Sequence, residues 1–559
     1  MTEDKPEFIH QLYSSFNHYL ALKWYITRDR IEFLNPALLF HVKMARFHAQ
    51  ELKAHMRLFR IEEHSDEIHD VVSTPIFTEH VGKSLFDAHK TKSGYKKKIL
   101  PQYGLLAGDI SAGGGPNESV RLVYNVAAPS SIFICGSQGS GKSHTLATLL
   151  ENCLVQSVAN VLTRPLAGLV FHYDSVVSDA GGLPCEAAYL SSNKNVNVRV
   201  LCPPTNTATI KKIYSCLPKV SIQELRFCQD SLNTKRMLNL MVASPGQTGR
   251  MPLYLHTVMR VLRELRINQQ RQGEGFNYQE FKNAMEAEPL TKEQSVPLQQ
   301  RLETLENFMV KQDTNAGGPA NKKGENKWAS DSVEVHGIVD WKPVSGQLTV
   351  VDLSCPCVTA EQACSLFDIC LMVALDKSHK YMTETDESQV FTESLLSAIR
   401  LQRHNGTRII ISTQEPTISP GLLDLCPITI VHRFTSPVWL QVLRRHLAGA
   451  SEMGGCKEPE ANGGELQTSG QSRQVLPAPK RYRTIPGPEL FSNIVHFRTG
   501  EAFLFAPSGM VDAIPRSQSK ISAAVDQSGW QPVFLGDGIM KVRIRNRITV
   551  DGGKSIIAR

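Results

Sequence analysis

Short apolar runs alternate with amphipathic segments through most of the chain. The runs are rich in β-branched residues and are bounded by Gly, Pro, Asn and Asp, a pattern typical of buried strands. We therefore predict strands at 131–135, 166–174, 196–204, 347–354, 371–376, 407–414 and 428–434. Because helical patterns separate them, the sequence predicts an α/β fold with a mainly parallel sheet flanked by helices on both faces.

Other parts of the chain break this alternation and divide it into regions. Residues 1–105 predict a helical N-terminal region, and residues 106–448 contain the alternating core. A charged, mostly helical insert interrupts that core at about 206–345. Residues 449–488 are of low complexity and predict a disordered linker. Residues 489–559 predict terminal strands that complete the core or pack on it.

The N-terminal region carries two basic features, and each has two interpretations. From Pro36 onward, apolar residues recur at helical spacing with lysines and arginines among the polar positions. This predicts either a packed helix with a solvated basic face or a helix that contacts nucleic acid. Similarly, the lysine cluster at 90–98 fits a solvated loop, a nuclear signal or a phosphate-binding patch.

Composition narrows the class of protein without identifying a partner. The 559 residues are 41% hydrophobic and 21% charged, which is typical of folded globular proteins. The net charge of +7 permits an anionic partner but does not require one. There is no apolar run long enough to span a membrane and no apolar leader at the N-terminus. The 12 cysteines include no CxxC pair, so we expect reduced thiols in the cytoplasm or nucleus.

The stretch GSQGSGKS at 136–143 matches the phosphate-binding pattern G-x-x-x-x-G-K-[ST]. It lies between a predicted strand and a helical pattern, where backbone N–H groups and the helix dipole both favour phosphate. A lysine in this pattern reaches the β- and γ-phosphates, and the hydroxyl after it holds Mg²⁺. The sequence therefore predicts ATP and Mg²⁺ as cofactors. The predicted binding residues are Gly136, Gly139, Ser140, Gly141, Lys142, Ser143, His144 and Thr145, with Ser143 on the metal.

Four further segments follow in an order like that of a known family. They are QLTVVDLS at 347–354, VALDKSHKYM at 373–382, TRIIISTQEP at 407–416 and FRTGEAFLFAP at 497–507. With the phosphate-binding loop, they resemble the HerA/FtsK branch of P-loop ATPases, and within it uncharacterised eukaryotic HerA-like proteins. The resemblance implies a P-loop NTPase core of the RecA/HerA type.

The resemblance also implies roles for residues outside the loop. Asp376 would orient Mg²⁺ through water, and Gln414 would be a polar sensor near the γ-phosphate. Arg400 and Arg403 would stabilise developing charge, across the subunit interface of a homo-oligomer, although a solvated helix face is the alternative for both. Asp352 also ends a predicted strand, and it is the alternative to Asp376 as the metal-orienting carboxylate.

Two departures from the family pattern affect catalysis. The family has Glu after the metal-orienting Asp, where this chain has Lys377, and an ammonium group cannot accept a proton from the attacking water. In addition, the helical pattern that starts near residue 361 runs into the predicted strand at 371–376 with almost no connecting residues. Connections of two to six residues are usual in α/β units. We therefore expect weak or absent hydrolysis.

The segment KVRIRNRITV near the end of the chain alternates basic and apolar residues. A charged edge strand is one interpretation. The others are a phosphate-contacting track for nucleic acid and an arginine delivered to a neighbouring subunit. The basic residues are Lys541, Arg543, Arg545 and Arg547.

Three functions compete on these observations. The first is an ATP-binding protein whose hydrolysis is weak or lost, which we favour because of Lys377. The second is an active ATP-driven translocase or helicase-like motor on nucleic acid. The third is a small-molecule kinase, since phosphate-binding loops serve many chemistries, but the Thr-Gln-x-Pro element and the large inserts argue against it.

Overall fold

The computed structural model describes residues 73–87, 102–111, 120–174, 181–241, 253–273, 275–310, 339–375, 387–416, 419–447, 450, 482, 485–515 and 530–552. The chain divides into two compact units, Met1–Asp70 and Val71–Arg559, and all described residues belong to the second. The predicted helix after Pro36 and the lysine cluster at 90–98 lie outside the described residues.

The larger sheet contains eleven of the described strands. They are β1 (Ile76–Thr78), β2 (Gln102–Asp109), β3 (Arg121–Tyr124), β4 (Ser130–Cys135), β5 (Asn160–Leu162), β10 (Arg408–Thr413), β11 (Ile428–His432), β12 (Glu501–Phe505), β13 (Met510–Pro515), β14 (Trp530–Phe534) and β15 (Met540–Ile544). Their order is β10-β4-β11-β12-β15-β2-β3-β1-β13-β14, and β5 pairs with β2.

The directions of these strands only partly match the sequence prediction. The α/β class is confirmed, and β4 pairs in parallel with both β10 and β11. From β12 through β3, however, each neighbouring pair is antiparallel. The prediction of a mainly parallel sheet is therefore wrong for this sheet. Its antiparallel part consists mainly of strands between residues 76 and 124 and strands after residue 500.

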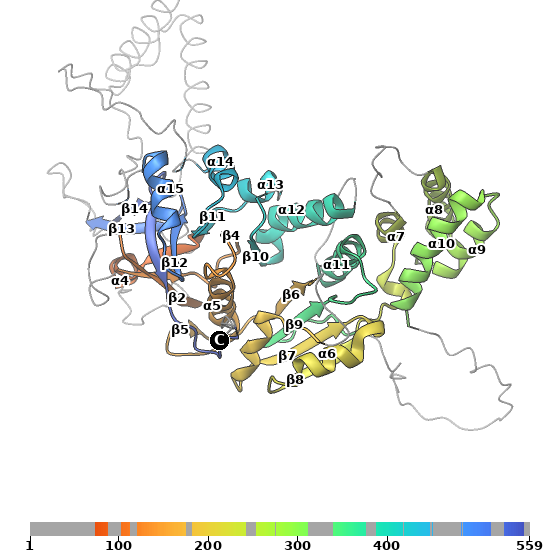
Figure 1. Ribbon diagram of the computed structural model, residues 1–559, viewed down its shortest axis with the longest axis horizontal. Helices are drawn as coiled ribbons and strands as arrows, with labels where there is room; N and C mark the ends of the chain where they lie inside the picture. The colour runs from red at the N-terminus through yellow and green to blue at the C-terminus, as the bar shows by residue number, and fades with distance from the viewer. Residues whose placement is uncertain are drawn as a thin grey trace, which may run out of the picture. The chain divides into compact units, whose positions relative to one another are not determined.

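A second sheet is wholly parallel. Its strands are β6 (Gly168–His172), β7 (Asn197–Cys202), β8 (Val220–Glu224) and β9 (Gln347–Asp352), in the order β6-β9-β7-β8 (Figure 1). Four residues of β9 are apolar or Thr and nearly the whole strand is buried, as expected where both faces of a parallel sheet are covered.

Helices occupy most of the remaining described chain. They are α4 (Glu79–Asp87), α5 (Lys142–Leu154), α6 (Thr207–Tyr214), α7 (Thr234–Met241), α8 (Leu253–Gln272), α9 (Tyr278–Glu286), α10 (Lys292–Asn307), α11 (Ala360–Leu375), α12 (Glu387–Asn405), α13 (Pro420–Asp424), α14 (Pro437–His446) and α15 (Gly487–Val495). Three 3₁₀ turns are η1 (Glu186–Ser192), η2 (Pro204–Asn206) and η3 (Gln229–Ser231). None of the described helices is both long enough and apolar enough to cross a membrane.

One predicted strand is helical instead. The apolar run that begins at Leu371 forms the last turn of α11, so the prediction of a strand at 371–376 is wrong. Leu, Met and Ala are strong helix formers, and no turn residues separate them from the helical pattern before them. Continuing the helix therefore costs less than reversing the chain.

Without that strand, two sheet edges stay unpaired in the part of the chain that the structure describes. β10 pairs only with β4, and β6 pairs only with β9. The residues of both edge strands are half-buried or exposed, whereas β4 is buried throughout. A parallel strand normally has neighbours on both sides. The two sheets are therefore separate ladders here.

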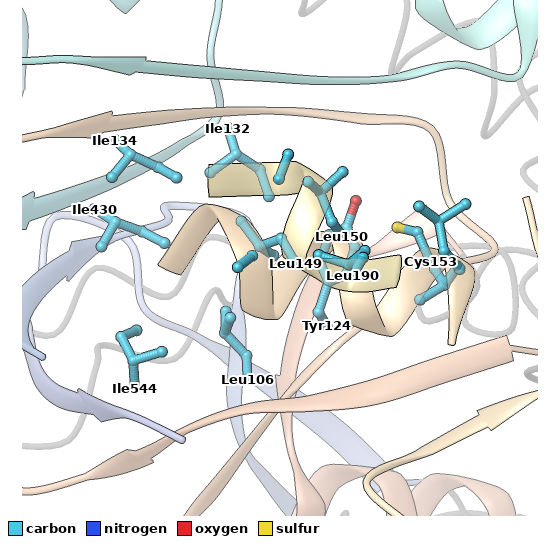
Figure 2. Packing of buried hydrophobic residues seen from close by; sticks show 14 of the residues in the cluster. Leu106, Tyr124, Ile132, Ile134, Leu149, Leu150, Cys153, Leu190, Ile430 and Ile544 are labelled. Carbon is cyan, nitrogen blue, oxygen red and sulfur yellow. The ribbon is translucent and has the colours of Figure 1, made fainter. Parts of the chain in front are cut away.

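Helix α5 joins the two sheets through one hydrophobic core. It lies against β4 and β10 of the larger sheet and against β6 of the smaller one. Figure 2 shows Leu149 and Leu150 of α5 among Ile132, Ile134 and Ile430 of the neighbouring strands. The same buried cluster continues to strands β7 and β9 of the second sheet. This helix and the loop before it are thus fixed from several sides.

The region boundaries differ from the predicted ones in two places. The boundary predicted at residue 105 falls inside β2, and β1 lies before it. At the other end, β12 continues the larger sheet directly from β11. Within the predicted linker at 449–488, the Tyr482 hydroxyl is buried and donates to Asp109 at 2.7 Å. The described cysteines form no disulfide with one another.

Candidate functional site

The loop between β4 and α5 has a backbone that requires glycine. Gly136, Gly139 and Gly141 all have positive φ angles, of 152°, 71° and 108°. A Cβ at Gly141 would lie 2.9 Å from the backbone nitrogen of Gly500, closer than real Cβ atoms approach. These residues therefore form a tight concave turn that other residue types would distort.

Neighbouring strands hold this loop from outside. The N–H of Ser137 donates to the carbonyl of Arg433, just after β11, at 2.8 Å. On the other side, the N–H of Gly500, just before β12, donates to the carbonyl of Ser140 at 3.3 Å. Both contacts fix the loop while its inner surface faces away from them. The loop is therefore preorganised by the sheet.

Three polar groups of the loop are suited to an anion. The Ser140 Oγ is buried and has no hydrogen-bond partner among the described residues. Lys142 donates to the Ser137 carbonyl at 2.8 Å, and burial lowers the pKa of its ammonium group. A neighbouring anion would stabilise the charged form. The free N–H groups at the start of α5 also favour negative charge.

A cavity of about 420 Å³ opens beside the start of α5. This volume is within the usual range for small-molecule sites. The two unpaired sheet edges contribute to its wall, β6 on one side and the end of β10 on the other. Its lining consists of Lys142, Ser143, Leu146, Ala147, Val170, Phe171, His172, Cys185, Glu186, Ala187, Ser412, Thr413 and Gln414.

Three residues predicted from the sequence meet in this cavity. Lys142 and Ser143 come from α5, and Gln414 directly follows β10. The Gln414 carbonyl accepts a hydrogen bond from the Trp439 indole at 3.1 Å, which anchors its backbone. The loop and the end of β10 are adjacent because β10 and β4 pair in parallel. Parallel pairing places both carboxyl ends at one edge of the sheet.

Two other predicted residues face away from the cavity lining. The His144 Nε2 lies 2.8 Å from the Arg545 carbonyl and donates a hydrogen bond to it. The Thr145 side chain is buried against His432, with 2.8 Å between Oγ1 and Nε2. Their described contacts are structural, since both tie α5 to distant parts of the chain.

His432 is a neutral support beneath the loop. Its Nδ1 lies 3.0 Å from the Glu501 carbonyl, and because a carbonyl only accepts, Nδ1 carries the proton. Nε2 then accepts from the Thr145 hydroxyl. Burial lowers the pKa of His432 to about 4, so the ring is uncharged at neutral pH. The loop therefore rests on a neutral, fully hydrogen-bonded imidazole.

Asp352, the alternative metal-orienting carboxylate, is engaged by its own surroundings. It ends β9 and is 2% exposed. The Tyr214 hydroxyl donates to Oδ2 at 2.6 Å, and the Ser354 N–H donates to Oδ1 at 3.0 Å. Asp352 is not among the cavity-lining residues. Both oxygens thus stabilise the second sheet.

Asp376 and Lys377 lie outside the described residues, so their predicted roles stay predictions. The chain is helical up to Leu375, immediately before them. Among the residues with described positions, no three His, Cys, Asp or Glu side chains are grouped to hold a metal ion. A cation at this cavity would therefore need oxygen ligands from a bound anion.

Arg400 and Arg403 are exposed near the end of α12 and do not line the cavity. Their exposure fits the solvated helix face that was the alternative. A role across a subunit interface is untested, because a single chain is described.

The basic terminal segment is not an edge strand, contrary to one prediction. β15 lies between β12 and β2. Lys541 lies over the Phe497 ring at 5.3 Å, and the three arginines form ion pairs. These pairs are Arg543 with Glu501, Arg545 with Glu151, and Arg547 with Glu186 and Asp551. The nucleic-acid contact predicted for these residues stays a prediction.

Sequence reasoning missed several residues of the site. Glu186 and His172 line the cavity, and His432 supports the loop. None belongs to a recognisable motif. His172 could have been found, because it lies near the end of the strand predicted at 166–174. Glu186 and His432 gave no such signal.

Comparison with known proteins adds no assignment. No protein-family model matches the chain, and no curated protein matches its sequence.

Proposed function

We propose that the chain binds ATP with Mg²⁺ in the cavity beside α5. The observation that carries this proposal is the meeting of a glycine-dependent loop, a helix N-terminus, Lys142 and Ser143 at one cavity of about 420 Å³. Each of these elements favours polyphosphate for a separate physical reason.

Each residue contributes a distinct interaction in this proposal. The backbone N–H groups of 139–143 donate to phosphate oxygens. Lys142 exchanges the Ser137 carbonyl for a β- or γ-phosphate, and the Ser143 hydroxyl contacts the cation. Gln414 donates or accepts at the far end of the phosphates. Bound Mg²⁺ would supply charge neutralisation of the phosphates.

We further propose that ATP hydrolysis is weak or lost. The resemblance to HerA/FtsK ATPases assigns the catalytic Glu to the position of Lys377, and an ammonium group cannot act as the base. The preceding segment is helical instead of forming the strand that would present Asp376. Both departures affect the water-activating half of the site and leave the phosphate-binding half intact.

Titration calorimetry of the full chain with ATP and Mg²⁺ tests binding. Lys142→Ala is expected to weaken affinity about 10- to 100-fold, the range for a lost charge-assisted hydrogen bond. Lys211→Ala, on α6 outside the cavity lining, is the matched control and should leave affinity unchanged. Equal affinity of Lys142→Ala and the unaltered chain would overturn the proposal.

Phosphate release, measured with and without DNA, tests the second part. We expect a rate close to that of Lys142→Ala under both conditions. Turnover that rises on addition of DNA would instead support the alternative of a nucleic-acid motor.

A further inference from the structure

The cavity has one acidic side chain among its described lining residues, Glu186. This residue begins η1, and its side chain is 23% exposed. It shares the cavity wall with Lys142 and Ser143. A carboxylate beside a polyphosphate is repulsive unless a cation lies between them. Its position therefore needs an explanation that phosphate binding alone does not supply.

Glu186 is held in place by the terminal segment of the chain. The Arg547 guanidinium donates to Oε1, and the Gly552 N–H donates to the same oxygen at 3.3 Å. Arg547 is itself only 2% exposed and also donates to the Thr549 hydroxyl oxygen at 3.3 Å. Oε2 accepts no hydrogen bond from the described residues. One oxygen is thus anchored, and the other has no hydrogen-bond donor among the described residues.

Mg²⁺ in nucleotide sites typically keeps several waters and uses one or two carboxylates together with phosphate oxygens. The cavity offers this set in part, a hydroxyl from Ser143 and a carboxylate from Glu186. The other candidate in a described position, Asp352, has both oxygens engaged. Glu186 is therefore the described carboxylate best placed to contact a hydrated cation.

We propose that Glu186 orients the hydrated divalent cation of the bound nucleotide, and that Arg547 positions Glu186 for this role. The inference rests on the proposed nucleotide site and adds a metal-orienting residue that no motif identifies. Arg547 is a positioning residue, because its guanidinium acts through Glu186. The terminal segment is thereby part of the nucleotide site.

The test compares ATP affinity in Mg²⁺ and in EDTA for the full chain, by titration calorimetry. For Glu186→Gln we expect affinity in Mg²⁺ to fall about tenfold, as for loss of a residue that supports a bound metal. Affinity in EDTA should stay equal or rise, because a negative charge near the phosphates has been removed. Opposite effects in the two conditions distinguish a cation contact from damage to the fold, which would weaken both.

Glu224→Gln is the matched control. Glu224 is the last residue of β8, does not line the cavity, and pairs with Arg226. It should behave like the unaltered chain in both conditions. Glu186→Asp should keep part of the Mg²⁺ dependence, and Arg547→Lys should reduce it without abolishing it. These two variants test the role if Glu186→Gln fails to fold.

The two proposals fail in different ways. No ATP binding, or binding unaffected by Lys142→Ala, would overturn the nucleotide site itself. Binding that requires Lys142 but has the same Mg²⁺ dependence in Glu186→Gln as in the unaltered chain would overturn only the role of Glu186.

Discussion

The sequence predicts one site built from two parts, the loop after β4 and the segment that begins at Leu371. The two parts differ in whether connecting residues separate them from the strand or helix before them. β4 is followed by six residues, Gly136–Gly141, before α5 begins. No connecting residues precede Leu371, and the apolar run that begins there continues helix α11 to Leu375. An apolar segment of about five residues fits either a strand or a helix, so the connection before it decides.

The strands beside these two parts also differ in how many neighbouring strands they have. On the loop side, β4 has parallel neighbours on both flanks, and the loop is bonded to residues beside β11 and β12. On the other side, β10 and β6 each have one described neighbour. The loop part of the predicted site therefore has more supporting contacts than the part expected to carry the metal-orienting carboxylate.

The largest expected change in the free energy of unfolding concerns the ion pair that anchors α5. Arg545 is 8% exposed and pairs with Glu151 of α5, which is 1% exposed, at 2.7 Å. We expect Arg545→Ala to lower the free energy of unfolding by about 3–5 kcal/mol, because Glu151 would be left buried without its counter-charge. Urea denaturation measures it.

The neighbouring Arg543 provides the control for that experiment. The nitrogen–oxygen distance in its ion pair with Glu501 is similar, 2.6 Å, but the Arg543 side chain is 53% exposed. Its partner Glu501 is 8% exposed, but because the Arg543 side chain is itself solvated, Arg543→Ala should cost less than Arg545→Ala, about 1–2 kcal/mol. Equal losses in the two variants would show that the anchoring of α5 does not depend on the buried pair.

The next effect is a pH dependence of stability arising beneath the loop. Burial lowers the pKa of His432 to about 4 from an ordinary value of 6.5, so the unfolded chain binds a proton that the folded chain does not. Stability is therefore complete above pH 6.5 and falls as the pH drops toward 4, by up to about 3 kcal/mol. Unfolding free energies measured between pH 4 and pH 7 would show this slope, and His432→Gln should flatten it. An unchanged slope in the variant would assign the effect to other groups.

A smaller effect separates two glycines of the loop. Gly141→Ala should cost about 2 kcal/mol, because φ is 108° and the added Cβ meets the Gly500 backbone. Gly139→Ala has a positive φ but open space around the added Cβ, and about 1 kcal/mol is expected. Thermal unfolding compares them. A greater loss at Gly139 would contradict the packing described for the loop.

The smallest expected change is in ATP turnover, and it concerns the segment that begins at Leu371. Lys377→Glu alone should leave ATP turnover unchanged, because the residues before it continue α11 to Leu375 in place of the strand predicted at 371–376. Inserting about four polar residues after Cys370 restores an ordinary connection length. We expect turnover only when both changes are combined. A gain from Lys377→Glu alone would show that the missing base is the whole defect.

Much of the fold could be predicted because local pattern and local structure agree. The strands at β4, β6, β7, β9, β10 and β11 and the helix α5 follow directly from their apolar runs and turn residues. The glycine-dependent turn after β4 was predictable because its glycines stand at fixed spacing between a strand and a helix, whereas its binding of phosphate stays a prediction. Gln414 was predicted from the resemblance to the HerA/FtsK branch, and it lines the cavity directly after β10.

The features that were not predicted depend on contacts between residues far apart in the sequence, which a local pattern does not indicate. The run at 371–376 carries strand-like hydrophobicity, but its helix formers and missing connection decided the outcome. The basic residues from Arg543 to Arg547 looked like one charged face, yet each pairs with a carboxylate far away in sequence. Glu186 entered the site only through the folding of such a distant segment.

The contacts between α5 and the end of the chain also bear on synthesis. Glu151 accepts hydrogen bonds from Thr549 and Ile548, nearly 400 positions later. Domains generally begin to fold as they leave the ribosome, N-terminal parts first. The first strands and α5 emerge long before the residues that neutralise this buried carboxylate. During synthesis Glu151 therefore lacks these partners until residues 548 and 549 have been made.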